Sequence, residues 1–459
     1  MSNPSASQPQ NTPAPSPSDP AGGPAAQSAG RSNPVRYAPP QMWLGVRKTL
    51  NSDAFGGALL LAATAAALIL ANTPLADWYT GIRDTVFGPS ALHLDLSVGT
   101  WAADGLLAIF FFVVGLELKE EFVAGRLRNP LRAALPITAA VGGVAVPAII
   151  FTVINLRSGG EALHGWAIPT ATDIAFAVAV LAVVGRFLPP ALRVFLLTLA
   201  IVDDLIAITI IAIFYSSDLH LLWFALAFVP LAIFAVLVQR GVRSWWILVP
   251  LGILTWGLVH AAGIHATVAG VMLGFTVPVR PTPRTRVRVG TDKHGIPEYE
   301  GLAAHFADQV GIISTLVAVP IFAFFSAGVT VGGLEGLRSA FADPITLGIV
   351  LGLVLGKPIG ILGATFLLSR LPSMRLDSEL RWADLTGMSF VAGIGFTVSL
   401  LVGELAFGAA SVADEHVKIG VLGGSFVAAV IGSVILSFGN RRAKLAQESA
   451  AGPETQHQS

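Results

Sequence analysis

Long apolar runs, separated by short polar segments, cover most of the chain between Gly45 and Asn440. A membrane-spanning helix needs roughly 20 mostly apolar residues. The pattern therefore predicts an all-α membrane protein with about 12 transmembrane helices. The predicted spans cover residues 55–72, 102–124, 130–154, 166–184, 191–215, 219–239, 245–261, 264–279, 305–327, 344–368, 384–407 and 416–438.

The two ends of the chain do not show this pattern. Residues 1–44 are rich in Ser, Pro, Ala, Gln and Gly, a composition that cannot bury enough apolar surface to fold. They also lack the charged, apolar and cleavage regions of a signal peptide. We therefore expect a disordered extension at 1–44, a transmembrane domain at 45–440 and a polar cytoplasmic tail at 441–459.

Basic residues are distributed unevenly between the two sides of the predicted spans. Of the 28 Lys and Arg residues, 23 lie in or beside the loops on the side of the two termini. Four lie on the opposite side, and Lys357 lies inside a span. Because cytoplasmic loops carry an excess of Lys and Arg, this distribution places both termini in the cytoplasm and supports an even number of spans.

A short segment between the first two spans has a different period. Apolar and polar residues alternate over Leu92–Val98, which favours a half-buried strand. The segment predicts a small β-hairpin on the extracytoplasmic side. Since an isolated hairpin is only marginally stable in water, it is a candidate contact for a homodimer.

Composition excludes several classes of function. Charged residues are 12% of the chain, hydrophobic residues are 54%, and the formal net charge is zero. A nucleic-acid-binding protein would normally carry a basic surplus. Without any cysteine there is no disulfide, no thiolate metal site and no cysteine nucleophile. We expect neither a cofactor nor an enzymatic activity.

Four ionisable residues, Asp173, Asp203, Asp204 and Lys357, lie near the middle of predicted spans. Ionisable groups inside a membrane are costly and indicate function by default. Asp203 and Asp204 are adjacent on a helix, so their side chains point about 100° apart and can line two sides of one cavity. One can hold a cation while the other meets Lys357. A structural ion pair would need only one acid, and here there are three.

Two predicted spans contain interruptions. In Ile168–Asp173, Pro169 removes a backbone donor, and in Gly393–Ser399 the glycines permit unwinding. Glycines that allow close helix packing explain the second segment equally well when it is taken alone. However, each interrupted span is the middle one of three, and the two groups of three enter the membrane from opposite sides. Inverted repeats with broken helices indicate a transporter with a site near the midplane.

The sequence around these residues resembles the NhaA-type sodium/proton antiporters over roughly residues 45–440. The resemblance implies that two broken helices of inverted repeats cross at the midplane. It also implies electrogenic, pH-regulated exchange of cytoplasmic Na⁺ or Li⁺ for external H⁺ in the plasma membrane of a bacterium, for sodium and pH homeostasis. The segments that carry the resemblance are 111–117, 165–176, 200–205, 263–267, 356–358 and 393–397.

The resemblance assigns roles to the residues near the breaks. Asp204 corresponds to the central cation-binding carboxylate, and Asp203 to the acid that pairs with the membrane lysine, here Lys357. Thr172 and Asp173 occupy the broken-helix positions beside the site. Asp204 and Asp173 would therefore hold the transported Na⁺.

Three further residues match positions linked to the cytoplasmic funnel and to the pH response. Glu117 matches an acid of the funnel, and Glu121 lies four residues on along the same helical face. His265 matches a histidine linked to pH response in members of this family.

These groups suggest a mechanism based on competition. Na⁺ and Li⁺ are hard cations that prefer oxygen ligands, and the same carboxylates bind protons. A site that holds either protons or sodium gives exchange once access alternates between the two faces. The partners are then Na⁺, H⁺ and membrane lipid, without nucleic acid.

Three alternatives use the same inventory of residues. A sodium-coupled symporter of the same fold would need further polar groups around its substrate. An intramembrane aspartyl protease needs two facing carboxylates, but no Gly-x-Gly-Asp motif is present, and Lys357 would have no role. An ion channel is disfavoured because no repeated carbonyl or acid motif occurs in the sequence.

Overall fold

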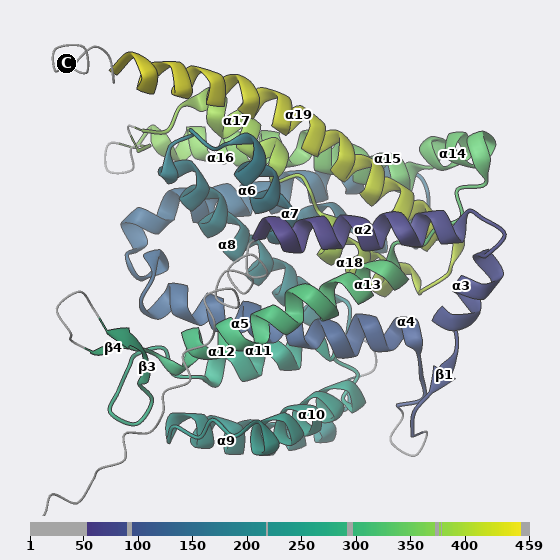
Figure 1. Cartoon of the computed structure of the whole chain (residues 1–459). Helices are drawn as coiled ribbons and strands as arrows, with labels where there is room; N and C mark the ends of the chain where they lie inside the picture. Colours follow the sequence, from purple (N-terminus) through teal and green to yellow (C-terminus); the bar gives the residue numbers. More distant parts are fainter. Residues whose placement is uncertain are drawn as a thin grey trace, which may run out of the picture. The chain divides into compact units, whose positions relative to one another are not determined.

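The computed structural model describes residues 53–89, 94–216, 219–291, 297–371, 376–377 and 379–450. The predicted extension at 1–44 lies outside the described residues. The predicted tail at 441–459 begins inside the last helix, α19 (Val412–Ala450), and its residues 451–459 lie outside the described part. Where the chain is described, most of it is helical (Figure 1).

Seven of the predicted spans coincide with helices that are long and apolar enough to cross a membrane without a sharp bend. Several of these contain a wider π-helical turn, for example η2 (Trp101–Leu106), η5 (Ser314–Ala318) and η6 (Gly352–Gly356). The seven are α4–η2–α5 (Val98–Val123, with α4 Val98–Thr100 and α5 Leu107–Val123), α6 (Pro130–Asn155), α8 (Pro190–Phe214), α9 (Leu221–Gln239), α12–η5–α13 (Leu302–Ser326, with α12 Leu302–Ile313 and α13 Val319–Ser326), α15–η6–α16 (Pro344–Ser369, with α15 Pro344–Leu351 and α16 Lys357–Ser369) and α19.

The remaining predicted spans are bent or short. Counting each bent pair as one span gives up to ten spans by length and composition, and two shorter apolar helices cover the other two predicted segments. Among the described residues, the exact number of spans therefore stays a prediction, although each predicted segment contains a helix. The bent pairs are α2 (Asp53–Ala71) with α3 (Ala76–Arg83) at 117°, η4 (Ala162–Thr170) with α7 (Ile174–Val184) at 40°, and α17 (Trp382–Val391) with α18 (Phe396–Phe407) at 45°; the short helices are α10 (Trp245–Ala261) and α11 (Thr267–Thr276).

Two small antiparallel sheets accompany the helices. β1 (Val86–Phe87) pairs with β2 (Leu96–Ser97). The strand predicted over Leu92–Val98 is therefore shorter than expected, because Val98 begins α4 and the Ser97 side chain accepts a hydrogen bond from the backbone of that helix. Residues 90–93 lie outside the described part. A second sheet, β3 (Val287–Thr291) with β4 (Pro297–Glu300), was not predicted; the other elements are η3 (Arg126–Arg128) and α14 (Gly333–Ala342).

The helix that carries Lys357 is packed closely against α6. A Cβ added at Gly142 of α6 would collide with the carbonyl oxygen of Gly360 on α16, and the reverse addition would collide with the carbonyl of Gly142. The two backbones therefore approach as closely as small residues allow in membrane helices. This contact fixes α16, and with it the position of Lys357, against α6 (Figure 1).

Candidate functional site

The two predicted interruptions contact each other. The link between η4 and α7 lies against the link between α17 and α18. The backbone N–H of Asp173 donates to the carbonyl of Ile394 at 2.6 Å, and the hydroxyl of Thr172 donates to the carbonyl of Ala392 at 2.8 Å. At each break, backbone groups lose their partners within the helix. The donors of the first link and the carbonyls of the second link satisfy one another, as buried backbone requires.

Asp173 joins the beginnings of both second half-helices. Its Oδ1 accepts a hydrogen bond from the backbone N–H of Phe176 at 3.0 Å and so caps α7. Its Oδ2 accepts from the backbone N–H of Thr397 at 3.2 Å, in the first turn of α18. Helix N-termini carry a partial positive charge, so one buried carboxylate stabilises two such ends at once.

Lys357 and Asp203 form a fully buried ion pair. The Lys357 Nζ atom lies 2.6 Å from Asp203 Oδ2, and neither side chain is exposed. Lys357 also donates to the hydroxyl of Thr172 at 2.9 Å, and Thr172 donates onward to the carbonyl of Ala392. The contact that the sequence suggested between one of the paired acids and Lys357 is therefore present. It ties α8, α16 and both broken spans together.

Asp204 is buried beside this pair, and one of its carboxylate oxygens can still accept a ligand. It is 2% exposed, and its Oδ1 atom has no hydrogen-bond partner among the described residues. It interacts electrostatically with Asp173, Asp203, Lys357 and Glu117. A buried carboxylate oxygen without a donor is costly, so Asp204 is suited to accept a proton or a small cation.

No resident metal centre is visible in the described ranges, because no three His, Asp or Glu side chains there converge as metal ligands would. A cation bound near Asp204 would have to complete its oxygen ligands from hydroxyls, backbone carbonyls or water.

Of the residues predicted for the funnel and the pH response, Glu117 interacts electrostatically with Asp204, and His265 contacts a different carboxylate. Glu117 and Glu121 are one turn apart on α5, and Glu117 is exposed. His265 lies between α10 and α11, with its Nδ1 3.6 Å from Oδ1 of Asp104. Since Asp104 belongs to η2 and Glu117 to the far half of α5, the structure separates His265 from Glu117 by most of one span.

Sequence reasoning did not single out several polar residues that support the crossing. The hydroxyl of Ser399 donates to the carbonyl of Ile168 at 2.6 Å, and the hydroxyl oxygen of Ser425 accepts from the backbone N–H of Gly395 at 3.2 Å. Serine is common enough in membrane helices that neither position stood out. Glu404 differs from these serines because it is an ionisable residue inside a predicted span. The rule that such residues indicate function, which selected Asp173, applies to Glu404 equally.

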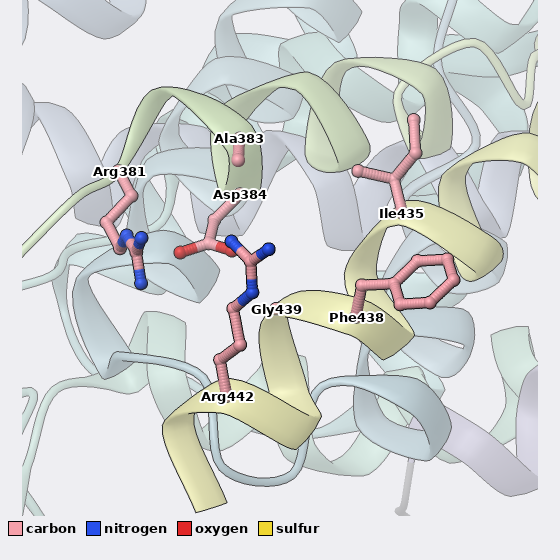
Figure 2. Close-up of a pocket in the computed structure, with 7 residues that line it drawn as sticks. All are labelled: Arg381, Ala383, Asp384, Ile435, Phe438, Gly439 and Arg442. Carbon is pink, nitrogen blue, oxygen red and sulfur yellow. The ribbon is translucent and has the colours of Figure 1, made fainter. Parts of the chain in front are cut away.

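Figure 2 shows a pocket elsewhere, between α17 and α19. Two arginine side chains approach Asp384 from opposite sides there (Figure 2). None of the predicted site residues lines this pocket, so the crossing and not this pocket is the candidate ion site. The pocket is lined by Arg381, Ala383, Asp384, Ile435, Phe438, Gly439 and Arg442.

The crossing makes a direct prediction about stability. A Cβ at Gly395 would lie 2.9 Å from the carbonyl oxygen of Ala171 on the other link. We expect Gly395→Ala to destabilise the protein by about 1–3 kcal/mol, the usual cost of overpacking. Thermal unfolding in detergent measures this, with Gly363→Ala as the control, because nothing lies within 4 Å of a Cβ there. Equal melting temperatures for the two variants would contradict the close contact.

Known proteins resemble this chain in sequence over most of its length. Residues 47–436 match the family model described as Na⁺/H⁺ antiporter 1. The chain is 61% identical over 408 residues to Na⁺/H⁺ antiporter NhaA 1 of Clavibacter michiganensis subsp. michiganensis, covering 88% of this chain and 94% of that protein. It is 60% identical over 400 residues to Na⁺/H⁺ antiporter NhaA 2 of Mycolicibacterium gilvum, covering 86% and 88%.

A solved structure, the sodium proton antiporter MjNhaP1 from Methanocaldococcus jannaschii at pH 8, is similar with a TM-score of 0.47 and 13% identity. It covers 88% of this chain and 98% of that one, but the likeness is too distant to support an argument. The family match and the identity to relatives over most of their length are sufficient to assign the chain to a family. They confirm the resemblance found in the sequence: the chain is a multi-pass membrane protein that belongs to the Na⁺/H⁺ antiporter 1 family.

Proposed function

We propose that the protein exchanges Na⁺ or Li⁺ for H⁺ across the plasma membrane of a bacterium. The observation that carries the proposal is the buried Oδ1 of Asp204, which has no partner among the described residues and lies beside the Asp203–Lys357 pair. A carboxylate can be neutralised by a proton or by a hard cation, but the two compete for the same oxygens. Membership of an antiporter family supports the same reading.

Each residue near Asp204 has a part in this mechanism. Lys357 neutralises Asp203, so the charge of Asp204 remains available for the ion. Asp173 holds the N-termini of α7 and α18, and Thr172 relays the contact of Lys357 to the second broken span. Because the carboxylates lie close together, they gain and lose protons as a set and not one by one.

Transport follows when the site opens alternately to the two faces. Ionised carboxylates take up Na⁺ from the cytoplasm, and protons from outside displace it after the site has turned outward. We propose that more than one proton enters for each Na⁺, so that exchange carries charge. The 23-to-4 distribution of basic residues supports cytoplasmic termini. Exchange changes only O–H bonds and ion contacts, so the proposal involves no cofactor and no enzymatic step.

We also propose a homodimer contact at the β1–β2 sheet. Val86 and Phe87 of β1 are 60% and 54% exposed, and a two-stranded sheet is only marginally stable alone. The apolar residues exposed on α9 and α10, such as Leu222 and Trp246, suit contact with lipid.

Purified protein in proteoliposomes with an enclosed pH-sensitive dye tests the exchange. After a proton gradient is imposed, Na⁺, Li⁺ or K⁺ is added across a series of pH values. We expect Na⁺ or Li⁺ to dissipate the gradient, more strongly as the pH rises, because deprotonated carboxylates are then free to bind the cation. Protein-free liposomes are the control. No cation-dependent proton movement at any pH would contradict exchange, and Na⁺ uptake that requires an organic anion would favour symport.

A further inference from the structure

A second group of ionisable side chains lies where α18 meets α19, apart from the site described above. Lys418 Nζ lies 2.7 Å from Asp414 Oδ2 and 3.9 Å from Glu404 Oε1. The side chains of Lys418, Asp414 and Glu404 are 3%, 0% and 14% exposed. Asp414 is one turn before Lys418 on the same helix, so it already balances the ammonium. Glu404 is the surplus carboxylate.

The groups that face Glu404 from other helices do not balance its charge. The hydroxyl of Ser326 on α13 hydrogen-bonds to it, and Asp104 of η2 interacts with it electrostatically. Tyr79 and Arg83 of α3 are also within electrostatic reach.

The nearby cations have carboxylate partners of their own. Arg83 pairs with Asp84 at 2.8 Å. His260 and His265 lie 3.9 and 3.6 Å from Asp104. When the histidines are neutral, the acids around Glu404 therefore outnumber the fixed cations. Like charges in a poorly solvated place are relieved when one of them takes up a proton.

Glu404 lies on the helix that reaches the ion site. The first turn of α18 contacts Asp173 through the backbone of Thr397, and Glu404 follows seven residues later. Seven residues are two helical turns, so both positions share one face about 10 Å apart along the axis. Asp104, which interacts with Glu404, lies 13 residues before Glu117 on the α4–α5 span. Glu404, on α18, therefore lies near the end of the α4–α5 span that holds Asp104, and Glu117 lies toward the other end of that span.

The distribution of basic residues indicates which side of the membrane this end of the molecule faces. Arg83 and Lys418 belong to the four basic residues on the sparsely basic side, which is the predicted outer face. Glu404 therefore lies between the predicted outer face and the broken-helix crossing, and its side chain is 14% exposed.

We propose that Glu404 binds and releases a transported proton between the outer face and the carboxylates at the crossing, which rests on the proposed exchange function. Its ionised carboxylate takes a proton from water at the outer side. About 10 Å of α18 separate Glu404 from the crossing, so the proton then passes along intervening water molecules to an ionised carboxylate of the crossing, and Glu404 becomes ionised again. No electron moves and no covalent bond other than O–H changes. Lys418, held by Asp414, positions Glu404 and keeps its ionised form stable between transfers.

The test compares Glu404→Gln and Glu404→Asp with Glu415→Gln in proteoliposomes. Glu415 is an exposed carboxylate on α19, so its replacement is a matched control. We expect Glu404→Gln to lower the maximal rate of Na⁺-driven proton movement roughly 10- to 100-fold, the lower range for loss of a positioned proton-transfer group. The Na⁺ concentration for half-maximal rate should stay within about twofold, because the cation binds elsewhere. Glu404→Asp should retain most of the rate.

A second measurement does not depend on transport. Infrared difference spectra between acidic and alkaline samples detect protonated carboxyl groups, and one band should be missing in Glu404→Gln but present in Glu415→Gln. An unchanged rate or an unchanged spectrum in Glu404→Gln would overturn the proposal. So would a lower rate accompanied by weaker Na⁺ affinity in both Glu404 variants, since that marks a structural role. If the wild type moves no protons, the proposed exchange function is refuted. The infrared band that is missing in Glu404→Gln still decides separately whether Glu404 holds a proton.

Discussion

Asp204→Asn should abolish Na⁺-dependent proton movement while the protein still folds. Asparagine keeps the shape of the side chain, but it carries no charge and takes up no proton at physiological pH. The buried Oδ1 of Asp204 has no partner among the described residues, so removal of the charge relieves a cost and should not lower the melting temperature. The dye assay in proteoliposomes should then give the signal of protein-free liposomes with every cation and at every pH tested.

The matched control for this variant is Asp77→Asn, the same substitution at an exposed carboxylate on α3. It should exchange at the wild-type rate. Wild-type exchange by Asp204→Asn would move the ion to another carboxylate, with Asp173 the next candidate. A large fall in the melting temperature of Asp204→Asn would instead show that its charge is needed for folding.

Lys357→Met should cause the largest loss of stability. The substitution leaves Asp203 buried without its cation, and breaking one side of a buried ion pair costs about 3–5 kcal/mol. It also removes the donor to Thr172, which loosens the contact with the second broken span. Thermal unfolding in detergent, compared with the wild type under the same conditions, measures the effect.

The double variant Asp203→Asn with Lys357→Met tests the cause. When both charges are removed, no unpaired ion remains, so most of the lost stability should return. As the control for removal of a lysine, Lys444→Met removes an exposed contact with Glu448 at 3.7 Å and a cation–π contact with Phe187 at 6.0 Å, and it should cost less than about 1 kcal/mol. A double variant as unstable as Lys357→Met would refute the ion pair as the reason for the loss.

The positions of the helices could be predicted because their apolar runs have the length that a membrane requires. Both breaks were also visible, since Pro169 and the glycines around Gly393 are poor residues for a continuous helix. A partner for Lys357 among the two adjacent aspartates was anticipated because a buried ammonium needs a carboxylate, and the family resemblance assigned that role to Asp203. In each case a local physical cost left a mark in the sequence.

Other features depend on contacts that no local pattern records. The double role of Asp173 requires the N–H of Thr397, which is 224 positions away. The π-helical turn before Lys357 adjoins prolines of two other helices, Pro147 and Pro169, and its sequence is ordinary apolar helix. The β3–β4 sheet lies in a polar segment between predicted spans, where no apolar run marks the strands. Glu404, in contrast, carries a local signal, because it is an acid inside a predicted span.

The hydrogen bonds of the crossing also bear on how the protein is made. Thr172, Asp173 and the carbonyl of Ile168 meet partners that lie 220 to 231 positions later in the chain. During synthesis from the N-terminus, the first broken helix must therefore enter the membrane long before residues 392–399 leave the ribosome. Its unwound backbone is then exposed to lipid or to insertion factors, at a considerable cost. Biogenesis, more than the finished fold, is where this protein depends on help from the cell's insertion machinery.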